Sequence, residues 1–409
     1  MKKILLCGMC LFLAFGWSKY SRADSSLYQP KTQDILYFQT NWLEQELKEA
    51  KDKNLVISPM SLYQALALFG HGLNGWELVS GMKYEDGTLY EIIASGDSSV
   101  LLDKGAFRIQ FTDDMLSDDQ VRIVNSIWGD SFLPQYVQNV QAYLKAEAKQ
   151  LPKNTKAIND WINKNTGGKI SNILQEKETT PIDLFLVNAI YFKADWMSKF
   201  KHTETYKAPF KSPTGVVDVN MMFDKKRVDY YEDEWMQAIR LPYEGKKHFM
   251  TFILPKEHVK WDDFIKKLGV NDFYLSFLKD MPVKIYLPKF KLEYQPQNMK
   301  QKLKNMGLGH LFNERVFLGT KNRATLREVM HKSIIAVDEK GTEAAAVTVM
   351  YMGDGGLFMP KLKRKDPYLI FRADRPFIFM LDEGLFVGVV NNPQGEERQA
   401  LLDTVSDKR

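Results

Sequence analysis

The sequence predicts an α+β fold in a single domain, and three observations lead to that prediction. Segments with helical periodicity dominate the first half of the chain, at 33–51, 59–69, 136–149 and 155–165. Runs with strand character crowd the region between residues 216 and 390. No internal repeat and no linker rich in Pro, Gly or Ser divides the 409 residues, and α+β folds reach this length as one domain.

The first two predicted helices differ in how much of their surface is apolar. Residues 33–51 place apolar and charged side chains at helical spacing, which predicts an amphipathic surface helix. The next helix has Ser58 as its N-cap and Pro59 at its first position, and it is apolar nearly all round up to Phe69. Ser58 and Ser61 are therefore either simple helix caps or members of a polar cluster beside the core.

A continuous apolar run at residues 184–192 predicts a strand that is buried on both faces. Asn188 interrupts this run, and an unpaired buried amide costs about 2–7 kcal/mol. Asn188 therefore either bonds to a polar cluster or lies where the strand is locally open. Further strands are expected at 121–128, 216–222, 227–231, 236–241, 249–254, 283–287, 288–293, 333–337, 377–381 and 385–390, with short helices at 261–268 and 298–306.

The first 23 residues have the pattern of a secretory signal peptide. Lys2 and Lys3 precede the apolar run 4–16, which is too short to span a membrane as a helix. The small residues Ser21 and Ala23 precede the expected cleavage site, which is after Ala23. We therefore expect an exported mature chain, 24–409, in the extracellular or periplasmic space, with no membrane span.

Removal of this peptide changes which functions the composition allows. Four basic residues leave with it, so 52 Lys and Arg oppose 51 Asp and Glu, and the net charge falls from +5 to +1. A nucleic-acid partner loses its electrostatic support. Cys7 and Cys10 also leave, so the mature chain has no disulfide, no thiolate metal site and no cysteine nucleophile.

No motif for catalysis or metal binding stands out in the rest of the chain. We find neither the spacing of metal ligands nor a nucleophile elbow, and the proximity of His331 and Ser333 is interpreted as coincidental. The sequence therefore predicts no enzyme activity, no catalytic residue, no metal and no cofactor.

The most informative stretch runs from Asp338 to Met359. If it is extended, one of its faces carries no charge and begins with small residues. The glycines within it, at 341, 353, 355 and 356, are nevertheless typical of a loop, which suggests a segment with two states. An ordinary Ala-rich loop or short helix is the alternative. The residues of the uncharged face are Thr342, Ala344, Ala346, Thr348, Met350 and Met352.

Residues 339–348 resemble the hinge of the reactive-centre loop in inhibitory serpins, and other motifs from Asn54 to Pro393 resemble the same family in the same order. Residues 75–119 depart most from the family pattern. The resemblance implies a serpin fold of about nine helices and three β-sheets, with an exposed loop at about 339–370 in a secreted bacterial protein. The matching motifs are 54–66, 161–170, 186–196, 241–245, 287–290, 331–332 and 371–379.

The resemblance also implies roles for individual residues. His331 becomes a latch rather than a base in a polar cluster, the shutter, beneath the point where the main sheet opens. Lys289 and Glu339 form an ion pair at the breach, at the top of that opening, unless they are two unrelated surface charges. The hinge residues are Glu339, Gly341, Thr342, Glu343, Ala344, Ala345, Ala346 and Thr348; the shutter residues are Ser58, Ser61, Asn188 and His331; the breach residues are Trp196, Lys289 and Glu339.

The activity implied is suicide inhibition of a serine endopeptidase, with cysteine endopeptidases as a further target class. The protease cuts the loop and forms an acyl-enzyme, and the cut loop then enters the main sheet as a new strand. No proline lies between Gly341 and Met359 to remove a ladder hydrogen bond. We expect a monomer that forms a covalent complex with its target endopeptidase; the alternative is a non-inhibitory serpin that acts as a chaperone or carrier.

The cleaved bond is expected between Gly355 and Gly356. Leu357, Phe358 and Met359 are alternative specificity residues that would suit chymotrypsin- or subtilisin-like proteases. The basic cluster that follows would suit trypsin-like proteases, or it is a solvated loop or a polyanion-binding surface. This cluster consists of Lys361, Lys363, Arg364 and Lys365.

Overall fold

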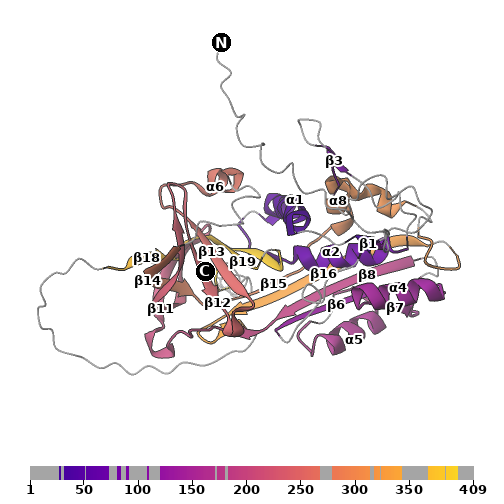
Figure 1. The fold of residues 1–409 in the computed structure, drawn as a ribbon, viewed down its shortest axis with the longest axis horizontal. Helices are drawn as coiled ribbons and strands as arrows, with labels where there is room; N and C mark the ends of the chain where they lie inside the picture. The colour runs from indigo at the N-terminus through magenta and orange to yellow at the C-terminus, as the bar shows by residue number, and fades with distance from the viewer. Residues whose placement is uncertain are drawn as a thin grey trace, which may run out of the picture.

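The structure is a computed structural model whose two large sheets lie side by side along the longest axis of the molecule (Figure 1). It describes residues 27–28, 32–50, 52–72, 81–83, 89–91, 108–109, 120–170, 173–179, 183–267, 279–313, 317–322, 324–342, 367–382 and 384–394. The signal peptide expected at residues 1–23 lies outside these ranges.

A seven-stranded sheet contains the long strands β6 (Val121–Gly129), β8 (Asp183–Phe192) and β16 (Thr325–Val337). β6 and β8 are antiparallel, whereas β8 and β16 are parallel neighbours from Asp183 to Tyr191. Beyond the end of β8, two short strands fill the sheet beside β16, namely β9 (Ala194–Asp195) and β17 (Gly341–Thr342). β7 (Glu147–Gln150) lies at the opposite edge, and β15 (Phe290–Tyr294) pairs with β16.

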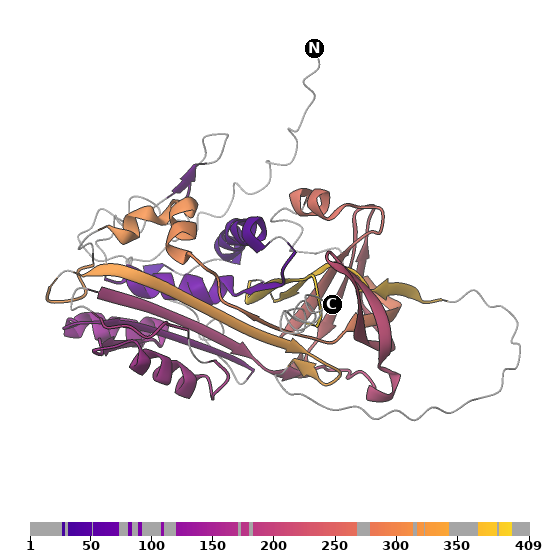
Figure 2. The same cartoon turned by 180° about the vertical axis from the view of Figure 1, so that it is seen from behind.

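Helices cover both faces of this sheet (Figures 1 and 2). α2 (Pro59–Gly70) packs against alternate residues of β8 that include Leu184 and Leu186. α5 (Lys156–Asn165) packs against the other parity, which includes Phe185 and Val187. β8 is therefore buried on both sides, as the continuous apolar run predicted.

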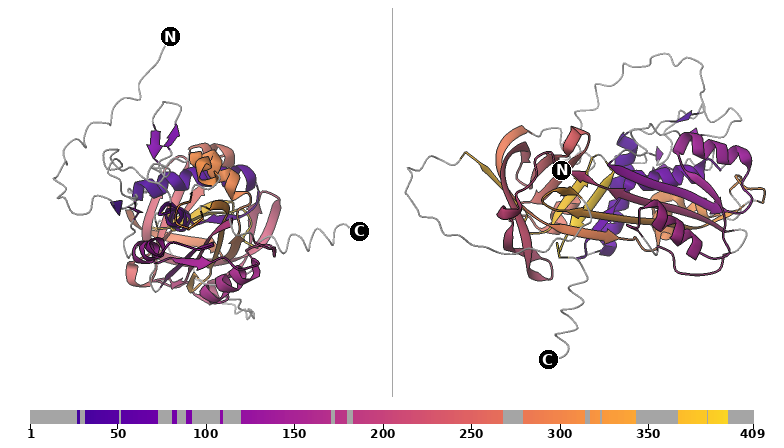
Figure 3. Two further views of the ribbon diagram at one scale, coloured as in Figure 1. Left: turned by 90° about the vertical axis from the view of Figure 1, so that its right-hand side faces the viewer. Right: turned by 90° about the horizontal axis from the view of Figure 1, so that it is seen from below.

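The second large sheet has nine strands in the order β18-β14-β11-β12-β13-β19-β20-β2, with β10 paired to β11. In the view from below, the pink strands of this sheet and the purple helices lie at opposite ends of the molecule (Figure 3). β11 has 18 residues and pairs with β10, β14 and β12 along its length, so it joins two groups of strands in one sheet. Two-stranded sheets β1-β5 and β3-β4 complete the strands of the described ranges. The bounds are β2 (Leu55–Ile57), β10 (Tyr206–Ser212), β11 (Gly215–Glu232), β12 (Met236–Pro242), β13 (Phe249–Pro255), β14 (Lys279–Pro288), β18 (Leu369–Arg372), β19 (Phe377–Leu381), β20 (Phe386–Val390), β1 (Leu27–Tyr28), β3 (Gly81–Lys83), β4 (Leu89–Glu91) and β5 (Arg108–Ile109).

The remaining helices mostly follow the sequence prediction, with one correction. The helix expected at 136–149 ends earlier, as α4 (Pro134–Leu144), because Lys145 adopts a left-handed conformation and the chain continues as β7. The helical periodicity of the sequence therefore continues past the end of α4 into the short edge strand β7. The others are α1 (Thr32–Ala50), α6 (Trp261–Lys267) and α8 (Met299–Leu303), the last followed by a π-helical segment, Lys304–Leu308. Within the described ranges, none of the helices is long and apolar enough to cross a bilayer.

Candidate functional site

A buried polar cluster lies where β8 and β16 run side by side beneath α2. Asn188 and His331 are direct partners in the β8–β16 register, and the Nδ1 of His331 lies 2.5 Å from the Oδ1 of Asn188. The amide nitrogen of Asn188 donates to the backbone oxygen of Ser61 on α2 at 2.8 Å and also contacts the Ser61 hydroxyl. The buried amide therefore bonds to a polar cluster, which is the first of the two alternatives raised by the sequence.

The imidazole of His331 is held neutral by burial and by the direction of its hydrogen bonds. Ser58 donates its backbone N–H to Nε2 at 3.2 Å, so Nε2 is the acceptor and Nδ1 carries the proton shared with Asn188. Burial lowers the pKa of His331 from 6.5 to about 3. This histidine is placed to hold two strands together rather than to exchange protons near neutral pH.

The two serines are helix caps as well as members of this cluster. Ser58 caps α2, and its Oγ accepts from the N–H of Ser61 at 3.3 Å, with Pro59 at the first helical turn. Both serines are fully buried. The two roles proposed for them from the sequence are therefore compatible, because the cap places them under the β8–β16 junction.

Three polar residues of the cluster were missed by sequence reasoning. Asn125 on β6 accepts from the amide of Asn188 at 2.7 Å and donates to Gln64 of α2 at 3.1 Å. Asn125 also lies among apolar residues of its strand, but Arg122 and Ser126 interrupt that strand as well, so its signal in the sequence is weaker than that of Asn188. The Ser333 hydroxyl lies 2.7 Å from Nε2 of His331, so the expectation that their proximity is coincidental is wrong. Alternation along β16 puts both on one face.

A second group of side chains lies at the top of the same sheet, where β17 begins. The ring of Trp196 stacks on Tyr243 with centroids 4.3 Å apart, and its Nε1 donates to the backbone oxygen of Asp338 at 2.9 Å. The hydroxyl of Tyr243 is hydrogen-bonded to that of Thr342 at 2.6 Å. Thr342 is 1% exposed. The first residue beyond Gly341 is thus already part of the packed sheet.

Gly341 is the residue type that this position requires. A Cβ at residue 341 would lie 2.0 Å from the backbone oxygen of Ala194 and 2.6 Å from the Cα of Asp195. Because these are backbone atoms of the paired strand β9, a side chain could enter only if the strands moved apart.

Lys289 and Glu339 are a real ion pair in this group, with 2.7 Å between Nζ and Oε2. The other carboxylate oxygen accepts from the Thr205 hydroxyl at 2.8 Å and lies 3.0 Å from Nδ1 of His202. Burial alone would raise the pKa of Glu339, but hydrogen bonds from Lys289, its own backbone and Thr205 hold that pKa below the usual 4.5. The alternative of two unrelated surface charges is excluded by this geometry.

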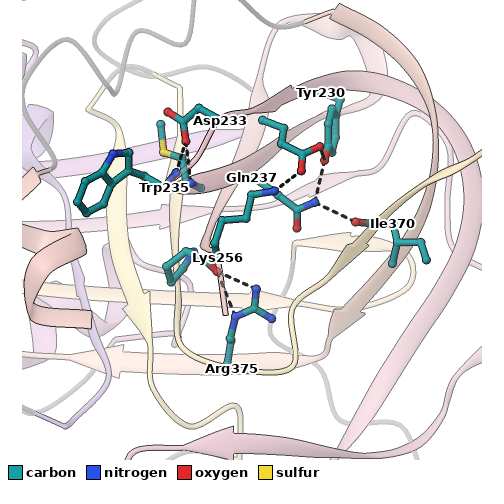
Figure 4. Close-up of polar contacts among 10 residues, drawn as sticks. Tyr230, Asp233, Trp235, Gln237, Lys256, Ile370 and Arg375 are labelled. Carbon is teal, nitrogen blue, oxygen red and sulfur yellow. Dashed lines mark hydrogen bonds and ion pairs between the residues drawn. The ribbon is translucent and has the colours of Figure 1, made fainter. Parts of the chain in front are cut away.

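The chain re-enters the described structure at the other sheet, as β18. Gln237 donates to the backbone oxygen of Ile370 at 3.2 Å and to the Tyr230 hydroxyl at 2.8 Å (Figure 4). Arg375 donates from Nε and Nη2 to the backbone oxygen of Pro255, at 3.1 and 2.7 Å (Figure 4). The segment that follows the expected loop is therefore tied to two neighbouring strands.

Several residues proposed from the sequence lie outside the described ranges. These are the hinge residues after Thr342, the expected cleavage positions and the basic cluster, so their roles remain predictions. In the described part of the chain, no group of His, Cys, Asp and Glu has the arrangement of a metal site. The residues concerned are Glu343, Ala344, Ala345, Ala346, Thr348, Gly355, Gly356, Leu357, Phe358, Met359, Lys361, Lys363, Arg364 and Lys365.

Comparison with known families agrees with the fold. A family described as Serpin (serine protease inhibitor) matches residues 36–393. The chain belongs to the serpin family. The resemblance inferred from the sequence motifs is therefore confirmed.

Individual relatives span most of this serpin. An uncharacterized serpin-like protein of Thermococcus kodakarensis is 34% identical over 293 residues, which cover 67% of each chain. Leukocyte elastase inhibitor of Bos taurus is 29% identical over 373 residues, covering 83% of this chain and 93% of the relative.

A solved structure confirms the expected fold. Serpin48 of the insect Tenebrio molitor, described as a highly specific serpin, superposes with a TM-score of 0.69 at 24% identity. The match covers 88% of this chain and 97% of that one. The α+β serpin fold is thus confirmed; within the described ranges its strands form two large sheets and two two-stranded sheets, where three sheets were expected.

Proposed function

We propose that the mature chain is a secreted suicide-substrate inhibitor of serine endopeptidases, and that cysteine endopeptidases are a further target class. The observation that carries the proposal is the position of Gly341 and Thr342. They form the start of a strand between β9 and β16, antiparallel to both. After cleavage, the loop would extend β17 into a longer strand between β8 and β16.

The strand pairing supports a favourable insertion. β8 and β16 are now parallel neighbours over most of β8, and parallel ladders are slightly less stable per residue than antiparallel ones. A strand that continues β17 would replace one parallel pairing with two antiparallel pairings. The uncut chain is thus less stable than the chain with its cut loop inserted, and this difference in free energy drives insertion.

If the inserted loop keeps the register of β17, an expected place follows for each hinge residue. Thr342 lies opposite Ala194 and Val337, so the same register sets Ala346 opposite Ile190 and Ser333. Thr348 then comes opposite Asn188 and His331, the pair that now joins β8 to β16. These hinge residues would face α2 and the core, where small uncharged side chains fit.

The proposal is tested by incubating the mature chain with chymotrypsin, subtilisin and trypsin. We expect a complex that survives SDS with at least one of them, and mass mapping of the released peptide then locates the cut. An uncomplexed protease together with a fully cleaved chain contradicts inhibition. With that result, the chain would be better described as a non-inhibitory serpin that acts as a carrier or chaperone.

A heating experiment separates insertion from simple cleavage. Limited proteolysis within 343–366 should raise the midpoint of thermal unfolding strongly if the cut loop becomes a strand, because β8 and β16 each gain an antiparallel neighbour. The uncut chain is the matched control. A cut chain that melts at the same temperature as the uncut chain contradicts insertion.

Export is a separate part of the proposal. Expression with residues 1–23 in a bacterial host should deliver a chain to the periplasm or medium whose first residue is Asp24. N-terminal mass analysis checks the cleavage site. An intact N-terminus in the cytoplasmic fraction contradicts it.

A further inference from the structure

A buried ion pair connects α1 to α8, next to β15. The Nζ of Lys302 lies 2.7 Å from the Oε2 of Glu46, and the two side chains are 2% and 0% exposed. Lys302 also lies 2.9 Å from Glu49, which is half exposed. Two charges this deep are tolerated only when each has close partners.

The carboxylate of Glu46 accepts two more hydrogen bonds. Trp42 donates from Nε1 to Oε1 at 2.7 Å, and the hydroxyl of Tyr294 donates to Oε2 at 2.6 Å. Glu46 therefore fixes the positions of an indole on α1 and a phenol on β15, in addition to its pairing with Lys302.

Both of these aromatic residues are connected to His331, Trp42 by a direct ring contact and Tyr294 through a neighbouring residue. The ring of Trp42 meets the imidazole edge-on, with centroids 4.9 Å apart at an angle of 78°. Tyr294 is the cross-strand partner of Ser333, whose hydroxyl is hydrogen-bonded to His331. Two routes thus run from one buried carboxylate to the imidazole that joins β16 to β8.

We propose that Glu46 and Lys302 are positioning residues that control how readily β8 and β16 separate. Together they hold Trp42 and Tyr294 in place, and these in turn hold His331 in its bond to Asn188. The proposal rests on the proposed function, because the separation that it controls is the one loop insertion requires. It adds a control point on α1 and α8, remote from the hinge and the breach.

The test uses hydrogen exchange of the intact, uncleaved mature chain. The variant Glu46→Leu/Lys302→Met removes both charges together, so no single charge is left buried. We expect exchange of the β8 and β16 amides to become at least about tenfold faster, while β13 and β19 change less than about twofold. Exchange that is unchanged in β8 and β16, or equally faster in β13 and β19, overturns the proposal.

A matched control and a second variant complete the experiment. Glu44→Gln/Lys48→Met removes an exposed pair on the same helix, 2.8 Å apart, and should leave exchange as in the unmodified chain. If the first variant does not fold, Trp42→Phe decides, since it keeps a ring but loses the donor to Glu46. A local rise in β8 and β16 supports the proposal, and unchanged exchange overturns it.

This measurement is independent of protease trapping. If no protease forms a complex while exchange in β8 and β16 responds as expected, only the proposed function fails. If a complex forms while exchange does not respond, only the role of Glu46 and Lys302 fails.

Discussion

The chain leaves one sheet at Thr342 and enters the other at Leu369, and the two anchors are built differently. The first is a strand of two residues, β17, at the end of a sheet whose neighbouring long strands are parallel. The second, β18, is tied by Gln237 and is followed by β19, which is buried between two antiparallel neighbours. The first anchor can extend into its sheet between two strands, whereas the second is an edge strand that pairs with β14 and leads into the enclosed strand β19.

The polar groups at the two anchors differ in the same way. Beneath the first anchor, Asn188 and His331 are fully buried and bridge two strands that must separate if the loop inserts. At the second anchor, Gln237 and Arg375 are partly exposed and bond to backbone oxygens. A buried network resists partial loss strongly, whereas an exposed bond is readily replaced by water. The comparison predicts which substitutions matter most.

The largest effect is expected from Thr342→Arg at the first anchor. A guanidinium would be forced into a site that is 1% exposed beside Tyr243, and burying a charge without a partner costs several kcal/mol. The uncut variant can avoid this cost by leaving β17 out of the sheet, whereas insertion requires β17 in place. The variant should therefore be cut as a substrate, with SDS-stable complex reduced more than about tenfold, since about 1.4 kcal/mol gives a factor of ten. Thr342→Ser keeps the hydroxyl and is the control. Complex at the unmodified level from the arginine variant would refute the role of this anchor.

Asn188→Ala should cost the most stability among the polar substitutions. It leaves the Nδ1–H of His331, the hydroxyl of Ser61 and the Oδ1 of Asn125 without the buried partner that Asn188 provides, at roughly 1–3 kcal/mol for each unsatisfied group. Urea unfolding should therefore show a loss of about 3 kcal/mol or more. A loss below about 1 kcal/mol would mean that the cluster contributes little to holding β8 against β16.

The pH dependence of stability should report on His331. Its pKa is lowered from 6.5 to about 3 in the folded chain, so the unfolded chain binds more protons between these values. Stability should therefore be complete above pH 6.5 and fall as the pH decreases, by up to about 1.4 kcal/mol per pH unit from this group. Urea midpoints from pH 7 to pH 4 should fall less steeply in His331→Gln. Equal slopes in both chains would remove His331 as the cause.

The smallest effect is expected at the second anchor, from Gln237→Ala. The variant loses one hydrogen bond to Ile370 and one to Tyr230, both near solvent, at about 0.5–1.5 kcal/mol each or less. Complex formation with a protease should be unchanged. A loss of stability as large as that of Asn188→Ala would abolish the difference between the two anchors.

The sequence predicted most elements because their periodicity is local. The run of apolar residues in β8 and the cap at Ser58 could be interpreted without any knowledge of their neighbours. The end of α4 was missed because a left-handed Lys145 leaves no clear signal in the sequence. Ser58, Ser61, Asn188 and His331 were assigned to one cluster through the family resemblance, whereas their hydrogen bonds and the part played by Asn125 and Ser333 came from the structure.

The pairing of Glu46 with Lys302 could not be predicted from the sequence. On a helical pattern Glu46 is an ordinary polar residue, and Lys302 lies in a short segment with several other lysines. Only the packing of α1 and α8 against β15 buries both residues and brings their charges together.

The sequence by itself determined the small, uncharged face that begins at Thr342, the buried strand with one amide, and the absence of cysteine after residue 23. These are properties of neighbouring residues, and composition and periodicity express them directly. Only the tertiary structure decided that β8 and β16 are parallel neighbours, that Asn188 meets His331 across 143 residues, and that Thr342 has already entered the sheet. The physical reason is that pairing between distant strands depends on how all the layers pack together.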